Sequence, residues 1–125
     1  MPVFSKKKFS MLTPEVEAKL AEMQAEEGQA PFESFIVVGL ETHVCVQQTC
    51  LDLLAKGHDV HLAADGISSM RAFDRTVALE RLRAACAFVT TAESLVFELL
   101  GDATHPNFKA CSALVKNRKA HWPFE

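Results

Sequence analysis

The stretch Ile36-Val-Val-Gly-Leu-Glu-Thr-His-Val-Cys45 is the most informative part of this chain. Its first residues, with Phe35 to Val38, form the continuous apolar run that is typical of a parallel strand buried on both faces. Gly39 then allows a sharp change of backbone direction. From Val44 the apolar residues recur at helical spacing, and Gly57 ends the run as a C-terminal cap. The stretch therefore predicts a buried strand that leads directly into a helix.

Cys45 falls in the first turn of that predicted helix. Unpaired backbone N–H groups and the positive end of the helix dipole favour a thiolate there, and the thiolate is the nucleophilic form of cysteine. Cysteine is also among the residue types that are most often buried, so packing alone would explain a cysteine at this position. The geometry of the turn leaves both interpretations open.

Length and composition exclude several classes of function. The chain has 125 residues, 49% of them hydrophobic, which is enough to build the core of one domain. A net charge of −3 gives no electrostatic reason to expect nucleic acid, and the cluster Lys6-Lys7-Lys8 is more typical of a solvated segment than of a binding patch. No apolar run approaches the ~18 residues of a membrane span, and the first residues lack the apolar core of a signal peptide. We expect no nucleic-acid and no membrane partner.

The cysteines indicate a reducing compartment. Cys45, Cys50, Cys86 and Cys111 form no Cys-x-x-Cys pair and have no metal-ligand spacing. Reduced thiols in a cytoplasmic protein are the expectation, with no metal and no cofactor.

Strands and helices alternate along the chain, which is typical of an α/β protein with three layers (αβα) and a parallel sheet. After the strand at Phe35–Val38, the pattern predicts strands at Val60–Ala64 and Ala87–Thr90 and a loop at Ile67–Arg71. It predicts helices at Pro14–Glu27, from Val44 to Gly57, at Asp74–Ala85, from the capping box Thr90–Glu93 to Gly101, and from Pro106 to Val115. On the last four of these helices, Val77 and Leu114 are among the residues that we expect to face inward.

Ligands of parallel α/β sheets bind beyond the carboxyl ends of the strands. Cys45 and Asp65 both fall at that predicted edge. Residues 116–125 are polar apart from Trp122 and Phe124, so we expect them to form a poorly ordered tail.

Several motifs are spread along the chain: Lys6-Lys-Lys-Phe-Ser-Met11, Thr13-Pro-Glu-Val16, Glu41-Thr-His-Val-Cys45, Ala78-Leu-Glu-Arg-Leu82, Thr90-Thr-Ala-Glu-Ser94 and His105-Pro-Asn-Phe-Lys109. Together they resemble the isochorismatase-like cysteine hydrolases, which include isochorismatases, nicotinamidases and N-carbamoyl amide hydrolases. The resemblance is strongest to the isochorismatase domain-containing subgroup, and it implies a Rossmann-type three-layer fold and a small-molecule substrate.

The resemblance also implies a site built on an Asp, Lys and Cys triad. Cys45 matches the nucleophile and Lys6 the lysine, although Lys7 and Lys8 are near enough for the register to differ. The family's cis peptide would fall between Leu40 and Glu41, and the backbone N–H groups of Glu41 and Cys45 would form the oxyanion hole. The Glu41 side chain would act as a base or, by our preferred interpretation, cap the helix start.

The chain departs from the family at the aspartate. The family places it in an Asp-x-Gln segment upstream of the lysine, so we expect a single partial domain over residues 1–125, truncated at its N-terminus, with residues 1–12 as the lysine-bearing segment. The zinc-binding Asp-x-His cluster of some members is absent as well. The acids that do not match the family position are Asp52, Asp59, Asp65 and the Glu22-Met-Gln24 run, and the candidate substitute bases are His43 and His61.

Two functions follow as hypotheses. The first is an isochorismatase-like hydrolase of a small amide, ester or vinyl ether with a cysteine nucleophile. The alternative is a catalytically inactive, truncated family member that acts as a binding or interaction fragment. Because the Phe35–Val38 strand would lack a neighbour on one side, its unpaired N–H and C=O groups predict a homo-oligomer or a poorly soluble chain.

Overall fold

The computed structural model describes residues 1–27 and 30–117, and the chain divides into two compact units, Met1–Thr91 and Ala92–Glu125. Most of the tail predicted to be poorly ordered, residues 118–125, lies outside the described residues. Each unit is described by itself below.

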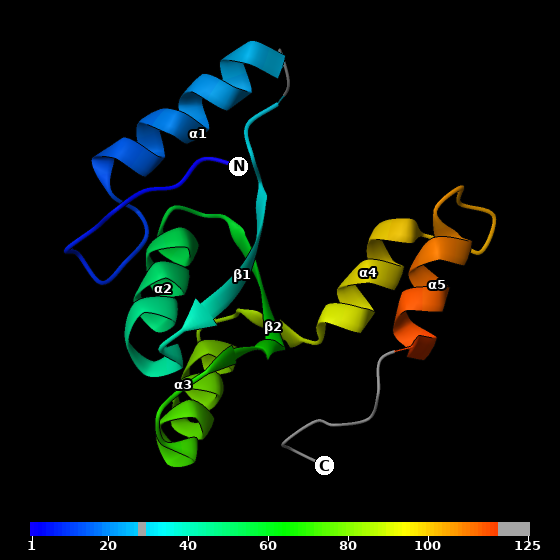
Figure 1. Ribbon diagram of the computed structural model, residues 1–125. Helices are drawn as coiled ribbons and strands as arrows, with labels where there is room; N and C mark the ends of the chain where they lie inside the picture. The colour runs from blue at the N-terminus through cyan, green and yellow to red at the C-terminus, as the bar shows by residue number, and fades with distance from the viewer. Residues whose placement is uncertain (28–29, 118–125) are drawn as a thin grey trace. The chain divides into compact units, whose positions relative to one another are not determined.

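The first unit is built on a parallel sheet. Its strands are β1 (Ser34–Leu40), β2 (Asp59–Ser68) and β3 (Phe88–Thr90), which lie side by side in that order (Figure 1). Helices separate them in the chain, as a parallel sheet requires. The predicted α/β class with a parallel sheet is confirmed.

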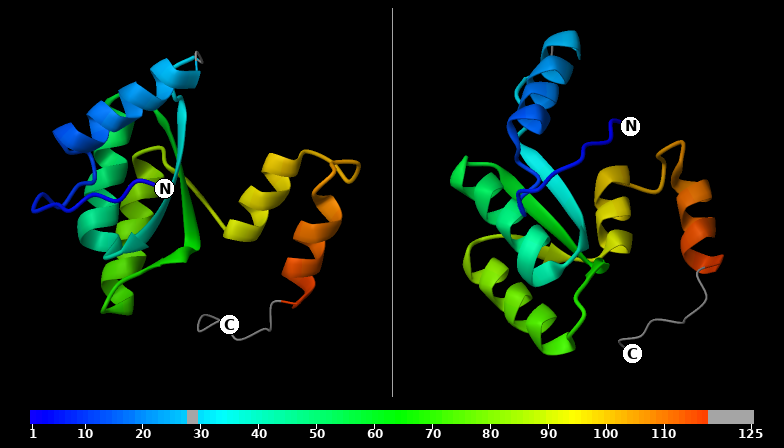
Figure 2. Two further views of the ribbon diagram at one scale, coloured as in Figure 1. Left: turned by 45° about the horizontal axis from the view of Figure 1, so that its top comes forward. Right: turned by 60° about the vertical axis from the view of Figure 1, so that its left-hand side comes forward.

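Two helices, α2 (Gln47–Ala55) and α3 (Ala72–Ala84), lie next to each other against one face of the sheet (Figures 1 and 2). Cys50 and Leu53 of α2 and Leu82 of α3 pack against Val60 and Leu62 of β2, and all of these side chains are buried. Burial of such apolar side chains contributes ~1.5–3 kcal/mol each. This core positions the loops at the carboxyl ends of β1 and β2.

Glycines mark the C-terminal ends of two helices. Gly57 ends α2 with a φ of +84°, and Gly101 ends α4 (Ala92–Leu100) with a φ of +78°. The region of positive φ is open to glycine at no steric cost, so both predicted helix ends are confirmed.

Strand β2 is longer than predicted because it contains a bulge. Val37 pairs with Leu62 but Gly39 pairs with Ile67, so extra residues of β2 lie between the two pairs. A Cβ at Gly66 would lie 2.8 Å from Cγ1 of Val38, so the two strands can approach this closely only at a residue without a side chain. The predictions that the strand ends at Ala64 and that Ile67 opens a loop were wrong.

One face of β1 is exposed. Phe35 and Val37 point toward the core, whereas Ile36, Val38 and Leu40 are 50%, 60% and 68% exposed. The prediction of a strand buried on both faces was therefore wrong for the described residues. The physical reason is that α2 and α3 pack on one face, while the opposite side chains of β1 keep most of their contact with solvent.

The remaining helices bury narrow stripes. On α1 (Pro14–Glu27), Val16, Leu20 and Met23 are half-buried, which is typical of a helix that covers a surface. The Thr13 hydroxyl accepts a hydrogen bond of 3.4 Å from the N–H of Val16 and so caps the start of this helix. The ion pair between Glu17 and Lys56 joins α1 to the end of α2.

In the second unit, α4 packs on α5 (Phe108–Asn117), with the ring centroids of Phe97 and Phe108 6.1 Å apart.

Two residues that were predicted to face inward are exposed: Val77 on α3 by 46% and Leu114 on α5 by 73%. Each lies beside the narrow stripe that its neighbours cover, because one packing partner shields only part of a helix circumference.

Candidate active site

Cys45 lies in a helical turn at the carboxyl end of β1. A π-helical turn, η1 (Thr42–Val46), precedes α2, with the carbonyl of Glu41 accepting hydrogen bonds from the N–H groups of Val44 at 3.1 Å and Val46 at 3.2 Å. The Thr42 side chain is buried and its hydroxyl donates to the carbonyl of Ser68 at 2.9 Å. Helical structure thus begins two residues before Val44, and the half-buried Cys45 stands in its first turn.

Lys6 and Cys45 line the same cavity, which has a volume of about 220 Å³. The rest of its wall is mostly apolar and comes from β1, the first turn of the helix and the N-terminal segment. The other lining residues are Met11, Val37, Val38, Gly39, Leu40, Val46 and Thr49. The structure therefore places Lys6 and Cys45, which are far apart in the sequence, in the wall of one cavity.

Of the three neighbouring lysines, Lys6 lines this cavity, whereas Lys7 and Lys8 do not. Lys6 is half-buried, and its Nζ donates to the carbonyls of Lys8 at 2.9 Å and Phe9 at 2.6 Å. Lys8 is exposed, and its Nζ donates to the carbonyl of Leu12 at 2.9 Å and lies 3.5 Å from the carboxylate of Asp52. Lys7 is exposed and does not line the cavity.

Thr49 has a role that sequence reasoning missed. Its hydroxyl donates to the carbonyl of Cys45 at 2.7 Å and accepts the N–H of Met11 at 2.9 Å, so one side chain links the lysine-bearing segment to the cysteine turn. The available signal was a threonine four residues after the cysteine, because Ser and Thr side chains in helices often bond the carbonyl of residue i−4.

The Leu40–Glu41 peptide bond is cis, as the resemblance implied. The carboxylate of Glu41 does not cap the helix start, so that interpretation was wrong. Oε2 of Glu41 instead accepts the N–H of Met70 at 2.9 Å, because a bond across to the segment after β2 satisfies the carboxylate there.

The candidate substitute bases lie outside the Cys45 cavity. Nδ1 of His43 is 3.0 Å from Oγ of Ser69 and 3.7 Å from the carboxylate of Glu41, and Nε2 is 3.9 Å from that of Asp74. His43, Glu41 and Asp74 line a separate cavity of about 300 Å³. His61 stacks on Phe88 with ring centroids 4.9 Å apart.

The acids are also placed away from Cys45. Asp52 pairs with Lys8, Asp59 begins β2 at the opposite end of the strand, and Asp65 lies in the bulge of β2. In the described part of the chain, no Asp or Glu side chain lines the Cys45 cavity.

Two further properties bear on the chemistry. Burial raises the pKa of the Cys50 thiol from 9.0 to about 11, so this thiol stays protonated well above neutral pH. Within residues 1–27 and 30–117, no group of three or more His, Cys, Asp or Glu side chains is placed to hold a metal ion, and no helix has the length and apolar character to cross a membrane.

Comparisons with known proteins point to one family. The Isochorismatase domain model matches residues 1–94. The chain is 49% identical over 114 residues to the secreted isochorismatase effector Isc1 of Phytophthora sojae, covering 91% of this chain and 52% of that protein. It is 47% identical to isochorismatase domain-containing protein 1 of Salmo salar, covering 91% of this chain and 38% of that protein. The chain thus spans about half the length, or less, of these curated relatives.

The solved structures agree as well. The structure titled MAR1 ribonuclease from Caenorhabditis elegans superposes with a TM-score of 0.84 at 35% identity, covering 99% of this chain and 60% of that one. A nicotinamidase from Bacillus subtilis superposes with a TM-score of 0.58 at 24% identity over 68% of this chain and 44% of that one, which shows a shared fold. Together with the domain match over residues 1–94, these likenesses show that the chain belongs to the isochorismatase family.

Proposed function

We propose that this chain forms the nucleophile-bearing part of an isochorismatase-like hydrolase site, which acts on a small amide, ester or vinyl ether through Cys45. The observation that supports this proposal most directly is the shared cavity of Lys6 and Cys45 at the carboxyl edge of the sheet. Cavities at this edge are where α/β proteins bind ligands, and a cation near a thiol favours its nucleophilic form.

For an amide or ester substrate, the proposed chemistry is an acyl transfer. The thiolate of Cys45 adds to the carbonyl carbon of an amide or ester, and the electron pair of the C=O bond moves onto oxygen. The backbone N–H groups of Glu41 and Cys45 stabilise this oxyanion. Collapse expels the amine or alcohol, which takes up a proton, and leaves a thioester that water then hydrolyses. Lys6 stabilises the thiolate before the attack.

No general base lines the cavity among the described residues, since its wall contains no carboxylate and no imidazole. General base catalysis contributes about 10²- to 10⁴-fold to such reactions. The chain is therefore expected to undergo acylation by an activated ester but not to turn over unactivated substrates. Turnover of generic amides and esters should be no faster than that of the Cys45→Ala variant.

Acylation by p-nitrophenyl acetate, followed by peptide mass mapping, tests the proposal. The acetyl group should appear on Cys45 in the unaltered chain and in Cys111→Ala, a matched control because Cys111 is also a half-buried free cysteine. It should be absent from that peptide in Cys45→Ala. Preferential acylation of Cys86 or Cys111 would refute the nucleophile assignment, and Cys45-dependent turnover of an unactivated amide would show that a base reaches the cavity.

RNA is a second substrate class to test, because the structure from Caenorhabditis elegans is titled a ribonuclease and aligns with 99% of this chain. The net charge of −3 gives no general attraction for a polyanion. A fluorescent single-stranded RNA incubated with the unaltered chain and with Cys45→Ala should be cleaved equally slowly by both. Cleavage that depends on Cys45 would replace the small-molecule proposal.

The location and assembly of the protein are part of the same proposal. The four free cysteines support a reducing, cytoplasmic compartment, although the relative from Phytophthora sojae is named a secreted effector. The exposed apolar side chains of β1 support a homo-oligomer.

A further inference from the structure

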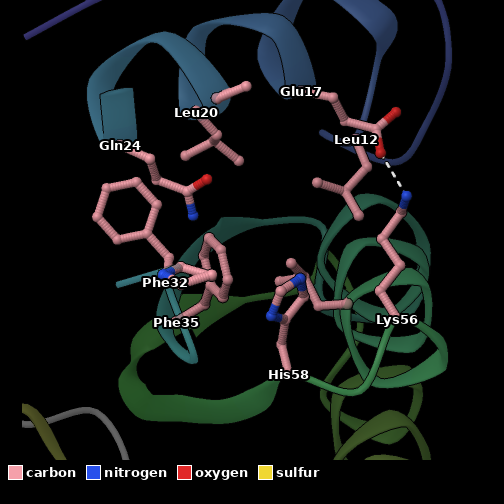
Figure 3. Close-up of a pocket in the computed structure, with 11 residues that line it drawn as sticks. Leu12, Glu17, Leu20, Gln24, Phe32, Phe35, Lys56 and His58 are labelled. Atoms are coloured by element: carbon pink, nitrogen blue, oxygen red, sulfur yellow. Dashed lines mark ion pairs between the residues drawn. The ribbon is translucent and has the colours of Figure 1, made fainter. Parts of the chain in front are cut away.

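The first unit contains a cavity of about 260 Å³ that is distinct from the Cys45 cavity. It lies between α1, the segment that enters β1 and the turn from α2 to β2 (Figure 3). Phe35 near the start of β1 lines it, whereas Leu40 at the end of the same strand lines the Cys45 cavity. The two cavities share no lining residue, so ligands of the two would bind independently.

One wall of this cavity is aromatic. Phe35 makes edge-to-face contacts with Phe32, at a centroid distance of 6.5 Å and an angle of 69°, and with His58, at 4.9 Å and 66°. These values are within the range in which aromatic rings attract one another. All three rings line the cavity, and Leu12 and Leu20 stand across from them (Figure 3). A flat ring placed there would contact ring edges and faces on one side and aliphatic groups on the other.

The charges of the lining cancel. Glu17 and Lys56 are its carboxylate and its ammonium group, and they form an ion pair with each other (Figure 3). A charged ligand would have to break this pair or remain unpaired in a largely apolar space, and both cost free energy. The cavity therefore favours an uncharged guest.

Two polar groups remain to orient such a guest. The side-chain amide of Gln24 points into the cavity, and no other described residue forms a hydrogen bond with it (Figure 3). The imidazole of His58 lies at the opposite side and can donate or accept a hydrogen bond. The volume is somewhat below the ~300 Å³ at which cavities for drug-sized ligands begin, which suits a ligand of one or two fused rings.

We propose that this cavity is a second small-molecule site, which takes an uncharged aromatic or heteroaromatic ring with one hydrogen-bonding group, such as a ring N–H. The ring stacks against Phe35 and His58, and its hydrogen-bonding group bonds to Gln24. The site is independent of Cys45 and of the proposed hydrolysis.

Indole is a suitable probe, with benzoate and benzylammonium as charged probes of similar size. Titration followed by ¹H–¹⁵N NMR should give saturable shifts at Leu20, Phe32 and His58, with a dissociation constant on the order of a millimolar for so small a ligand. The charged probes should bind roughly tenfold more weakly. The same titration of Cys45→Ala should be unchanged, which separates this site from the proposed active site.

A matched pair of variants on α1 locates the binding. Ala21→Trp fills the cavity from an exposed lining position, whereas Ala18→Trp adds the same side chain one turn away at an exposed position outside the lining. Indole should bind about tenfold more weakly to Ala21→Trp and unchanged to Ala18→Trp. If Ala21→Trp does not fold, Gln24→Leu provides the second test and should weaken indole binding. Shifts that do not saturate, shifts at the Cys45 cavity, equal loss in both tryptophan variants, or tighter binding of a charged probe would overturn the proposal.

Discussion

At the scale of single residues, the four free cysteines differ in burial and surroundings, and therefore in expected reactivity. Cys45 stands in a first helical turn and shares its cavity with Lys6, so it should be alkylated faster at pH 7 than Cys50, Cys86 or Cys111. Cys50 should be the slowest, because its thiol is buried and its pKa is raised to about 11. Iodoacetamide labelling with mass mapping measures all four rates, and a slow Cys45 would contradict the nucleophile assignment.

The same labelling separates Lys6 from its neighbour. Lys6→Gln removes the cation of the cavity, so alkylation of Cys45 at pH 7 should slow by roughly three- to tenfold. Lys7→Gln is the matched control, because Lys7 is exposed and lies outside the lining. An equal effect of both substitutions would show that Lys6 acts only through the overall positive charge of the N-terminal segment.

Cys50 also predicts a dependence of stability on pH. The folded-state pKa is raised from 9.0 to about 11, so between these pH values the unfolded chain loses the thiol proton while the native chain keeps it. The native state then binds more protons, and the free energy of unfolding falls as pH rises through this window. The full loss is about 2–3 kcal/mol, and it is absent below pH ~9. Urea unfolding of the unaltered chain should show this decline, and Cys50→Ala should not.

Thr49 predicts a structural cost that a matched threonine does not share. Thr49→Val preserves shape but leaves the N–H of Met11 without its acceptor, so the free energy of unfolding should fall by about 1–3 kcal/mol. Thr76 is exposed and also donates to the carbonyl four residues before it, at 3.1 Å, so Thr76→Val should cost less than about 0.5 kcal/mol. Equal losses would mean that the link to Met11 contributes nothing.

At the scale of secondary-structure elements, the bulge of β2 depends on a residue without a Cβ. In Gly66→Ala the new methyl would meet Cγ1 of Val38 at 2.8 Å, and relieving that contact should cost about 1–3 kcal/mol of stability. Shortening the partner in Gly66→Ala/Val38→Ala should restore part of the loss relative to Val38→Ala alone. Additive losses in this double-mutant cycle, measured by denaturant unfolding, would show that the two side chains do not meet.

The apolar periodicity and the glycines that end helices predicted most elements, and each wrong prediction has an identifiable cause. The helix ends at Gly57 and Gly101 followed from glycine chemistry, and the residues that α2 buries followed from helical spacing. The bulge of β2 was missed because Asp65-Gly66 also has the composition of a turn, and only the pairing of Gly39 with Ile67 shows that the strand continues.

The candidate site was predictable only in part. The family motifs pointed to Cys45, Lys6 and the Leu40–Glu41 peptide bond, and the structure places Lys6 and Cys45 in one cavity. The hydrogen bond from Met11 to Thr49 and the bond from Met70 to Glu41 could not be predicted, because each joins residues whose separation in sequence exceeds any local pattern.

At the scale of the whole molecule, the exposed row Ile36, Val38 and Leu40 predicts self-association. Apolar side chains on a strand with an unpaired edge are a common route to contacts between copies. Sedimentation velocity should show a concentration-dependent oligomer that Ile36→Lys weakens. Val77→Lys is the matched control, since Val77 is 46% exposed and Ile36 50%. A monomer at all concentrations, or an equal effect of both lysines, would contradict the prediction.

The link through Thr49 also bears on how the cavity behaves when the molecule moves. The lysine-bearing segment has no helix or strand of its own, and Met11 and Lys8 anchor it to Thr49 and Asp52 on the same helix, α2. Cys45 is tied to that helix by the same threonine. We therefore expect the segment that carries Lys6 and the turn that carries Cys45 to follow α2 when this helix shifts against the sheet. The distance between these two segments would then change less than their distance from Gly39 and Leu40 across the cavity.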